Sequence, residues 1–367
     1  MPSLLIRQYA TSIPPASLAL PVCSKEACDT LISIIHDAHL NTYAPARAYR
    51  TRFFKRVVDE LEARADYPIH ECIYETFLSA LSSPEDCAAP WLQVTAPSPA
   101  YKTHFYPLYD LLSLTDGHSP PARQSLCSEA QPWGRLTVFE SPALVEAGTT
   151  GLRTWRSALW MAEWLLDNAD VVRRETVLEL GSGTGFLGIL IAQIQLRSVT
   201  PSGSRAGEVW MTDNSEAAME RCAANVHLPC NNLQAHGGIH LLPLDWTCPA
   251  DELQATMALI KPDVVLACDV IFDASLAPDL VRVIGLALAT AKECWLACAV
   301  RNEETTAVFI GEAEGAGLDI KSVDWGFENE NERVFLGGNE GGEGIGEVRL
   351  MRLTKNGGSQ LHEMLSS

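Results

Sequence analysis

Apolar residues in the last two thirds of the chain fall into short runs that alternate with segments of helical periodicity. The short runs are typical of buried strands, whereas apolar residues spaced by three and four positions indicate helices. This alternation predicts a mostly parallel sheet with helices on both faces. The final two strands have no helix between them and are expected to pair antiparallel. The pattern predicts strands at 176–180, 208–212, 239–244, 263–268, 294–300, 318–325 and 347–353, and helices at 154–168, 186–196, 215–226, 276–291 and 303–316.

The first third of the chain has a different pattern. Residues 25 to about 82 are predicted to be helical, beginning with an amphipathic helix that Ser24 is expected to cap. A stretch rich in proline and serine between 96 and 121 interrupts regular structure. We therefore predict two domains: residues 1–131, mainly helical with a Pro/Ser-rich linker, and residues 132–367, which hold the alternating strands and helices.

Composition and charge exclude several classes of protein. Hydrophobic residues make up 47% of the chain, which is ample for a folded core. The formal net charge of −19 argues against binding of nucleic acid through a diffuse field and favours basic partners. No run approaches the roughly 18–20 apolar residues of a membrane span. Arg7 and two prolines interrupt the apolar start, so we expect no signal peptide and no membrane association.

The chain holds 11 cysteines, but they are scattered and lack the spacing of a zinc site. We expect no metal centre and predict that most of them are buried, reduced thiols. Reduced thiols are typical of a reducing compartment, the cytosol or the nucleus, and of these we predict the cytoplasm.

A glycine-rich loop, Glu179-Leu180-Gly181-Ser182-Gly183-Thr184-Gly185, comes directly after the first predicted strand and by itself indicates only a nucleoside cofactor. Glycines at the carboxyl end of such a strand let a nucleoside cofactor approach the backbone. The overlapping Gly183-x-Gly185-x-x-Gly188 also matches a dinucleotide fingerprint, so a nicotinamide cofactor is an alternative. Glu179, before the glycines, suits a cationic amino-acid ligand better than a pyrophosphate.

Three later strand ends carry further candidates. Asp213 could accept hydrogen bonds from ribose hydroxyls, or it could cap the helix that starts at Ser215. Asp245 could meet an adenine amino group and Trp246 could lie against the adenine ring, although a core tryptophan is the simpler interpretation.

Asp269 and Phe272 follow the fourth predicted strand, at the rim of the expected cofactor crevice. A carboxylate at position 269 could orient an incoming amine, and the ring at position 272 could line a slot for an aliphatic lysine stem. The alternative role of Asp269 is to cap a turn.

Taken in order, these motifs resemble those of a known family. The Glu-Leu-Gly-Ser-Gly-Thr-Gly, Leu-Asp-Trp and Ala-Cys-Asp-x-x-Phe segments look like those of the seven-β-strand protein-lysine methyltransferases. Segments 139–143, 148–155 and 299–305 are similar to the subfamily that methylates a lysine of translation elongation factor 2.

The resemblance implies a seven-stranded, doubly wound, Rossmann-like methyltransferase sheet with an N-terminal helical domain and S-adenosylmethionine as cofactor. It also implies a protein substrate, elongation factor 2, and we expect a monomer. A different acceptor, or a scaffold without activity, is the alternative. Trp155 would contact the cofactor, although its spacing is also that of a helix face. Phe272 stands where the family usually has tyrosine. The other implied cofactor contacts are Gly181, Ser182, Gly183, Trp246 and Cys268.

Overall fold

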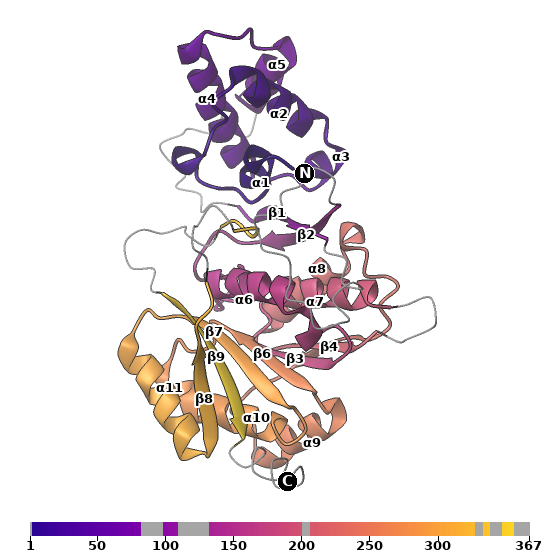
Figure 1. Cartoon of the computed structure of the whole chain (residues 1–367), viewed down its shortest axis with the longest axis vertical. Coiled ribbons are helices and arrows are strands. Elements are labelled where there is room, and N and C mark those ends of the chain that lie inside the picture. Colours follow the sequence, from indigo (N-terminus) through magenta and orange to yellow (C-terminus); the bar gives the residue numbers. More distant parts are fainter. Residues whose placement is uncertain are drawn as a thin grey trace, which may run out of the picture.

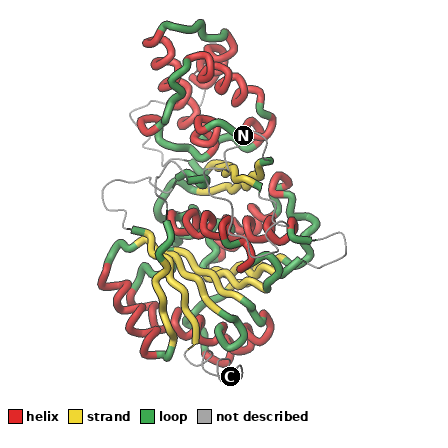
Figure 2. The backbone as a smooth tube through the Cα atoms, in the orientation of Figure 1, coloured by secondary structure: helices red, strands yellow, loops and turns green. Residues whose placement is uncertain are grey.

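A computed structural model describes residues 2–81, 98–108, 132–199, 206–326, 333–337 and 347–355. A seven-stranded sheet in the order β5-β4-β3-β6-β7-β9-β8 forms its centre (Figures 1 and 2). Strands β3 to β7 run parallel to one another, whereas β9 is antiparallel to both β7 and β8. The predicted doubly wound sheet and its antiparallel final pair are confirmed. The strands are β3 (Thr176–Leu180), β4 (Glu208–Asp213), β5 (Ile239–Pro243), β6 (Val264–Cys268), β7 (Glu293–Ala299), β8 (Leu318–Val323) and β9 (Val348–Lys355).

Helices cover both faces of this sheet, with one hydrophobic cluster on each side. The sequence pattern missed α9, although Leu253, Met257 and Ile260 mark its buried face. One face carries α6 (Arg156–Asp167), α7 (Phe186–Arg197) and α8 (Glu216–Val226), and the other carries α9 (Ala250–Ile260), α10 (Ala277–Ala287) and α11 (Glu303–Gly315).

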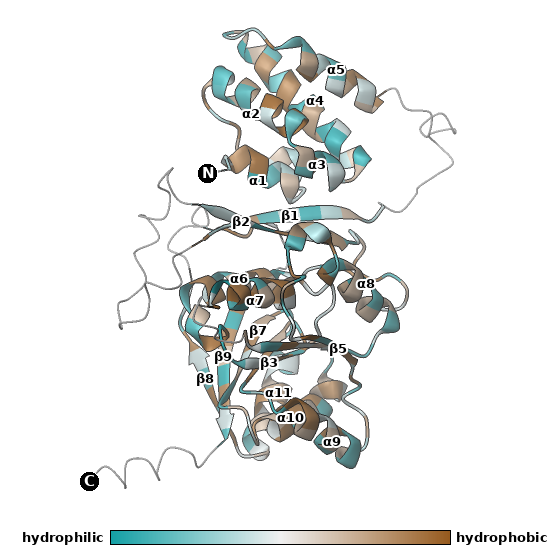
Figure 3. Cartoon of the chain, turned by 90° about the vertical axis from the view of Figure 1, so that its right-hand side faces the viewer, coloured by the Kyte–Doolittle hydropathy of each residue, from teal (hydrophilic) through white to brown (hydrophobic). Residues whose placement is uncertain are grey.

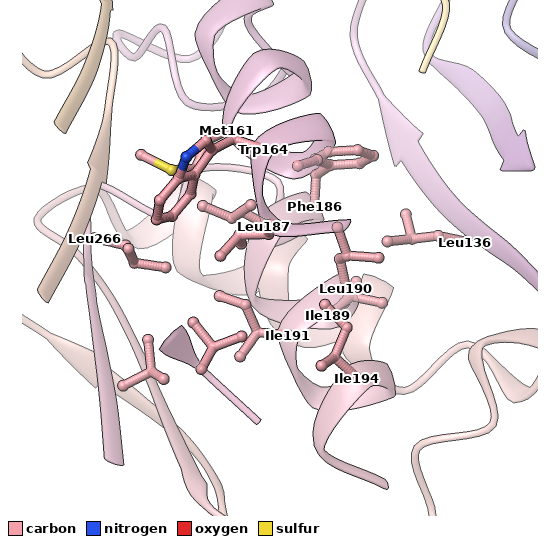
Figure 4. Close-up of a cluster of buried hydrophobic side chains, with 14 of the residues drawn as sticks. Leu136, Met161, Trp164, Phe186, Leu187, Ile189, Leu190, Ile191, Ile194 and Leu266 are labelled. Carbon is pink, nitrogen blue, oxygen red and sulfur yellow. The ribbon is translucent and has the colours of Figure 1, made fainter. Parts of the chain in front are cut away.

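Helix α7 is the most buried helix of the described chain, because a second layer covers its outer side. That layer is a two-stranded antiparallel sheet of β1 (Ala100–Pro107) and β2 (Trp133–Glu140). In Figure 4, Leu136 of β2 approaches α7 from one side and Leu266 of the central sheet lies on the other. A helix enclosed on two sides needs apolar residues all round, which explains the run from Phe186 to Ile194.

Strand β1 lies within the segment for which the sequence analysis predicted a linker, and that prediction is wrong for 100–107. Its partner β2 follows on the other side of residue 131, so the two strands pair across the expected domain boundary. A strand whose partner is distant in sequence leaves no turn signature, which is why the pattern did not reveal it. The division at residue 131 stays a prediction.

Strand β2 is completed along its other edge by two buried asparagines. Asn231 exchanges two hydrogen bonds with the backbone of Thr137, at 2.8 and 2.9 Å, as a neighbouring strand would. Asn225 of α8 does the same with Phe139, at 2.7 and 3.1 Å, and its amide also donates to the carbonyl of Thr184 in the glycine loop. The edge of the small sheet is therefore satisfied without a further strand.

The N-terminal part is helical, as predicted, and has a core of its own. Figure 3 shows it as a layer stacked on β1 and β2. Ser24 does not cap a helix: Cys23 is the N-cap residue, and Ser24 already lies inside the first turn. The helices are α1 (Leu4–Ala10), α2 (Ser24–His36), α3 (Ala38–Thr42), α4 (Arg47–Arg64) and α5 (Glu71–Leu81).

Polar contacts join these helices to the rest of the molecule. The imidazole Nε2 of His39 lies 3.0 Å from the Thr103 hydroxyl and 3.1 Å from the Thr137 hydroxyl. The guanidinium of Arg7 donates to the carbonyl oxygens of Arg333 and Val334 at 2.7 and 3.1 Å. Buried side chains with specific partners fix the orientation of packed layers. The N-terminal helices are thus docked on the small sheet rather than tethered beside it.

Replacing His104 by phenylalanine is expected to stabilise the protein, most of all in acid. His104 of β1 is buried beside Phe186, and neither ring nitrogen has a hydrogen-bond partner among the described residues. Burial lowers the pKa of His104 to about 4, so stability present above pH 6.5 is lost as the pH falls towards 4. His104→Phe removes this loss, and its advantage in unfolding free energy should grow by about 1 kcal/mol from pH 7.5 to 5.5.

Urea unfolding at the two pH values measures this difference. Tyr106→Phe is the matched control, because it removes the 2.6 Å hydrogen bond to Gln193 and should destabilise the protein. A His104→Phe variant less stable than the parent at both pH values would show that the imidazole makes a polar contact that the packing of β1 does not reveal.

Candidate active site

A cavity of about 450 Å³ opens at the carboxyl ends of β3, β4 and β6, where the strand order reverses. All eleven residues proposed from the sequence line it: Trp155, Glu179, Gly181, Ser182, Gly183, Asp213, Asp245, Trp246, Cys268, Asp269 and Phe272. Other lining residues come from segments that the sequence analysis named without giving each residue a role: Gly148, Thr149, Thr150, Gly151, Arg153, Thr154 and Thr184. Asn214, Thr247 and Val270 also line the cavity and were not considered.

The glycine loop turns sharply after β3 because its glycines adopt left-handed backbone conformations. Gly183 has φ +52°, and a Cβ atom there would lie 2.9 Å from the carbonyl oxygen of Gly151. The loop is tied to β4, since the amide of Ser182 donates to the Thr212 carbonyl at 2.8 Å and the amide of Thr212 donates to the Ser182 hydroxyl at 3.0 Å. Segment 148–155 therefore packs directly against the glycine loop, with no room for a side chain at position 183.

Glu179 is the buried acid of the cavity, with only 4% of its surface exposed. Its Oε2 atom has no hydrogen-bond partner among the described residues. Burial raises the pKa of Glu179 to about 8, against the lowering effect of hydrogen bonds from Ser182 and the Gly188 backbone. A buried carboxylate with a vacant acceptor beside a glycine loop fits a ligand that brings a cationic, hydrogen-bonding group.

Asp213 ends β4 and holds the glycine loop in place. Its carboxylate accepts from the amide of Gly183 at 3.1 Å and from the amide of Ser215 at 3.0 Å. Burial raises the pKa of Asp213. The alternative that Asp213 is the N-cap of α8 is wrong, because Ser215 is the N-cap and its hydroxyl accepts from Ala218.

Asp245 and Trp246 form one wall of the cavity. The Oδ1 atom of Asp245 accepts from the amide and the hydroxyl of Thr247, at 2.8 and 2.7 Å, and these bonds lower the pKa of Asp245. Trp246 is half-buried; it packs against the second core cluster and also presents its ring to Gly181. Trp246 therefore packs on the core and lines the cavity at the same time, and its contact with an adenine ring stays a prediction.

Asp269 follows β6 with φ +53°, an unusual conformation for a residue other than glycine. Its carboxylate accepts from the amide of Ser157 in the first turn of α6, at 3.2 Å, and from the amide of Ala299 at the end of β7, at 3.0 Å. The N-cap residue of α6 supplies no side-chain hydrogen bond, so Asp269 satisfies an otherwise unpaired amide of that helix. A strained residue fixed from two sides is typical of a functional site.

Trp155 is that N-cap residue, with extended backbone, so the alternative in which it lies on a helix face is wrong. Its indole nitrogen donates to the carbonyl of Thr150 at 3.0 Å. The guanidinium carbons of Arg153 and Arg301 lie 5.0 and 4.5 Å from the centre of its ring, within cation–π distance. Phe272 also lines the cavity and is 56% exposed.

This strand order, with a glycine loop and a buried acid at the point where it reverses, defines a Rossmann-like methyltransferase domain. Residues 143–315 match the sequence family described as lysine methyltransferase. This part of the chain is therefore similar to the lysine methyltransferases, which use S-adenosylmethionine as methyl donor.

Individual relatives agree with this assignment. Human protein-lysine N-methyltransferase EEF2KMT is 33% identical over 198 residues, which cover 50% of this chain and 56% of the relative. Protein-lysine N-methyltransferase EFM3 of Chaetomium thermophilum is 28% identical over 298 residues, 80% of each chain. The Saccharomyces cerevisiae EFM3 is 28% identical over 53% of this chain and 59% of the relative. The match thus spans little more than half of the human and yeast proteins.

An O-methyltransferase of Bacillus cereus, solved in complex with SAH, resembles the fold at a TM-score of 0.35 and 15% identity, over 58% of this chain and 84% of that chain. The fold assignment rests on the strand order. None of the described helices is long and apolar enough to cross a membrane. Within the described ranges, no group of three or more His, Cys, Asp or Glu side chains is arranged to hold a metal ion.

Proposed function

We propose that the chain transfers methyl groups from S-adenosylmethionine to a lysine side chain of translation elongation factor 2. The observation that carries this proposal is the meeting, in one cavity, of the vacant buried carboxylate of Glu179 with the strained, doubly held Asp269. Glu179 would pair with a cationic amino acid, and Asp269 would present a fixed carboxylate to an incoming amine.

The residues present fit the cofactor. Glu179 would accept from the cofactor's ammonium group, and Asp213 would accept from its ribose hydroxyls. Trp246 would cover the adenine ring, with Asp245 near the adenine amino group. Gly181 and Gly183 leave the backbone open to close approach. S-adenosylmethionine supplies a methyl group that is already activated on a sulfonium, so the protein mainly positions the reactants.

The acceptor amine must arrive neutral, because its lone pair attacks the methyl carbon while the carbon–sulfur bond breaks. Free lysine has a pKa of about 10.4, and desolvation in an apolar slot lowers it. The ring of Phe272 would form one wall of that slot. The proton leaves the amine to solvent. Asp269 already accepts two backbone amides, so we assign it the orientation of the amine rather than its deprotonation.

Surface charge supports a protein acceptor that carries positive charge around its target. The chain has a formal net charge of −19, which draws a lysine-rich surface towards the cavity. We propose a monomer that acts in the cytoplasm and does not bind nucleic acid. The cysteines support this location, because all of them in the described residues are free.

Raising the salt concentration is expected to slow capture of the acceptor. Between about 50 and 300 mM NaCl, kcat/KM for elongation factor 2 should fall several-fold while kcat stays constant, because salt screens attraction between exposed charges. Steady-state kinetics at several salt concentrations test this. If kcat/KM did not depend on salt, the acidic surface would have no part in attracting the acceptor and would serve solubility only.

Labelled S-adenosylmethionine tests the proposal itself. Incubation of the protein with purified elongation factor 2 should place label on one lysine-containing peptide, located by mass spectrometry, and an extract should show a labelled band of the same size. Label on another protein would keep the reaction and change the partner. Label on a small molecule alone, or cofactor binding without any transfer, would overturn the proposed function.

A further inference from the structure

Arg301 follows β7 and lies beside two of the residues that line the cavity. Its guanidinium carbon is 4.5 Å from the centre of the Trp155 ring, and its Nη2 atom is 3.9 Å from Oδ1 of Asp269. The Asp269 side chain is only 5% exposed, whereas that of Arg301 is 46% exposed. The arginine thus covers the solvent side of a buried carboxylate and is itself held on an aromatic face.

This arrangement bears on the charge of the acceptor. An isolated carboxylate near a lysine amine favours the ammonium form, which has no lone pair to attack the methyl group. Asp269 can orient the amine, but its negative charge also favours the unreactive ammonium form. A positive charge beside the carboxylate would offset this second effect. A guanidinium is positively charged throughout the physiological pH range, and a fixed cation beside the carboxylate favours the neutral amine.

The other charged groups around this cluster are three acids that line the cavity, a second arginine on the Trp155 ring and an ion pair beyond β7. Glu179, Asp213 and Asp245 line the same cavity and are acidic, so they too favour an ammonium. Arg153 also lines the cavity and is a second cation on the Trp155 ring, at 5.0 Å, but the ion pair with Asp269 is made by Arg301. Beyond the end of β7, Glu303 and Arg349 pair with each other through two hydrogen bonds of 2.7 and 3.0 Å.

We propose that Arg301 is a positioning residue whose fixed positive charge offsets the Asp269 carboxylate and keeps the acceptor amine neutral. This inference rests on the proposed function for the identity of the acceptor. The contact with the Trp155 ring and the ion pair with Asp269 keep the charge beside these two cavity residues.

The pH dependence of kcat/KM with elongation factor 2 is the first test. Arg301→Met keeps the aliphatic stem on Trp155 and removes the charge, and Arg301→Lys is the matched control that keeps the charge. In Arg301→Met the acid limb of the profile should move to higher pH by about half a unit or more, as expected for loss of a nearby, partly screened charge. In Arg301→Lys the acid limb should stay close to that of the parent. A deficit of equal size at every pH would overturn the proposal, because loss of packing alone has no such signature.

A second test needs no acceptor. S-adenosylmethionine carries a positive sulfur and S-adenosylhomocysteine does not, so a nearby cation disfavours the former. Calorimetry should show that Arg301→Met lowers the ratio of the Kd for S-adenosylmethionine to the Kd for S-adenosylhomocysteine by about threefold, with no change in Arg301→Lys. An unchanged ratio in Arg301→Met would overturn the placement of this charge at the transfer site.

The two tests separate the two claims. A shifted ratio in a protein that labels no elongation factor 2 would refute the proposed substrate and retain the electrostatic role of Arg301. Labelling of elongation factor 2 with neither shift would retain the proposed function and leave Arg301 as a packing residue only.

Discussion

Replacement of Glu179 by glutamine is expected to weaken S-adenosylmethionine binding at least tenfold at pH 8. The cofactor's ammonium would lose a buried, charge-assisted partner, and such contacts contribute several times more than exposed ones. Isothermal titration measures the loss. Glu175→Gln is the matched control, because Glu175 lies just before the opposite end of β3 and pairs with Lys292 on the surface. Unchanged binding in Glu179→Gln would remove this residue from the cofactor site.

The same substitution is expected to stabilise the empty protein in mild alkali. The pKa of Glu179 is raised to about 8 by burial, so the stability associated with its neutral form is present below pH 4.5 and is lost as the pH rises through 8. Glutamine does not titrate. From pH 5.5 to 8.5 the unfolding free energy of the parent should therefore fall by on the order of 3 kcal/mol relative to Glu179→Gln. Urea unfolding without cofactor tests this.

Weaker cofactor binding together with higher stability in Glu179→Gln would show that this acid serves the function and destabilises the fold. A residue that served only the core would lose stability on substitution. Parallel pH curves for the parent and Glu179→Gln would instead show that the carboxylate is paired or hydrated in the empty protein.

Replacement of Asp269 by alanine is expected to lower the methylation rate at least a hundredfold and the unfolding free energy by about 2–4 kcal/mol. Two backbone amides, those of Ser157 and Ala299, would lose their acceptor. Alanine would also keep the left-handed backbone of a residue with φ +53° without any compensating contact. Single-turnover kinetics and urea unfolding measure the two effects.

Two further variants separate the role in catalysis from the role in folding. Asp269→Asn keeps one oxygen acceptor but directs an amide hydrogen at the second backbone amide, so it should be intermediate in stability. Asp273→Ala is the control from the same loop, since Asp273 is exposed and the hydrogen bonds described for its side chain all go to Ser275. Parental methylation by Asp269→Ala would exclude any part for this carboxylate in the reaction.

Much of the central domain could be predicted from the sequence because its signals are local. Strand β3 was predicted at its observed bounds, and the other strands of the central sheet within about two residues, since short apolar runs mark buried strands wherever they occur. The glycine loop and the acids at the strand ends followed from the rule that parallel strands present their carboxyl ends to a ligand. These signals depend only on the residue types within short segments, so they can be recognised without knowledge of the tertiary structure.

Contacts between segments that are distant in sequence could not be predicted from such local signals. Strand β1 has no partner nearby in sequence, and the polar residues that complete β2, Asn225 and Asn231, come from a helix and a turn far along the chain. The Cys23–Ser24 boundary was misplaced because a buried serine and a capping serine look alike in a sequence. Each of these features depends on which surfaces meet, and periodicity does not encode that.

The sequence by itself determined the kind of sheet, the glycine loop and most of the residues around it, because strand ends and glycine turns are local consequences of residue type. Trp155 and Cys268 were proposed only through the resemblance to a known family. Only the tertiary structure decided how those residues are held. It placed Asp269 on the first turn of α6, left Glu179 with a vacant acceptor and brought Arg301 onto Trp155. Hydrogen bonds and charges act over a few ångströms in space, and the fold alone sets which residues, distant along the chain, come within that range.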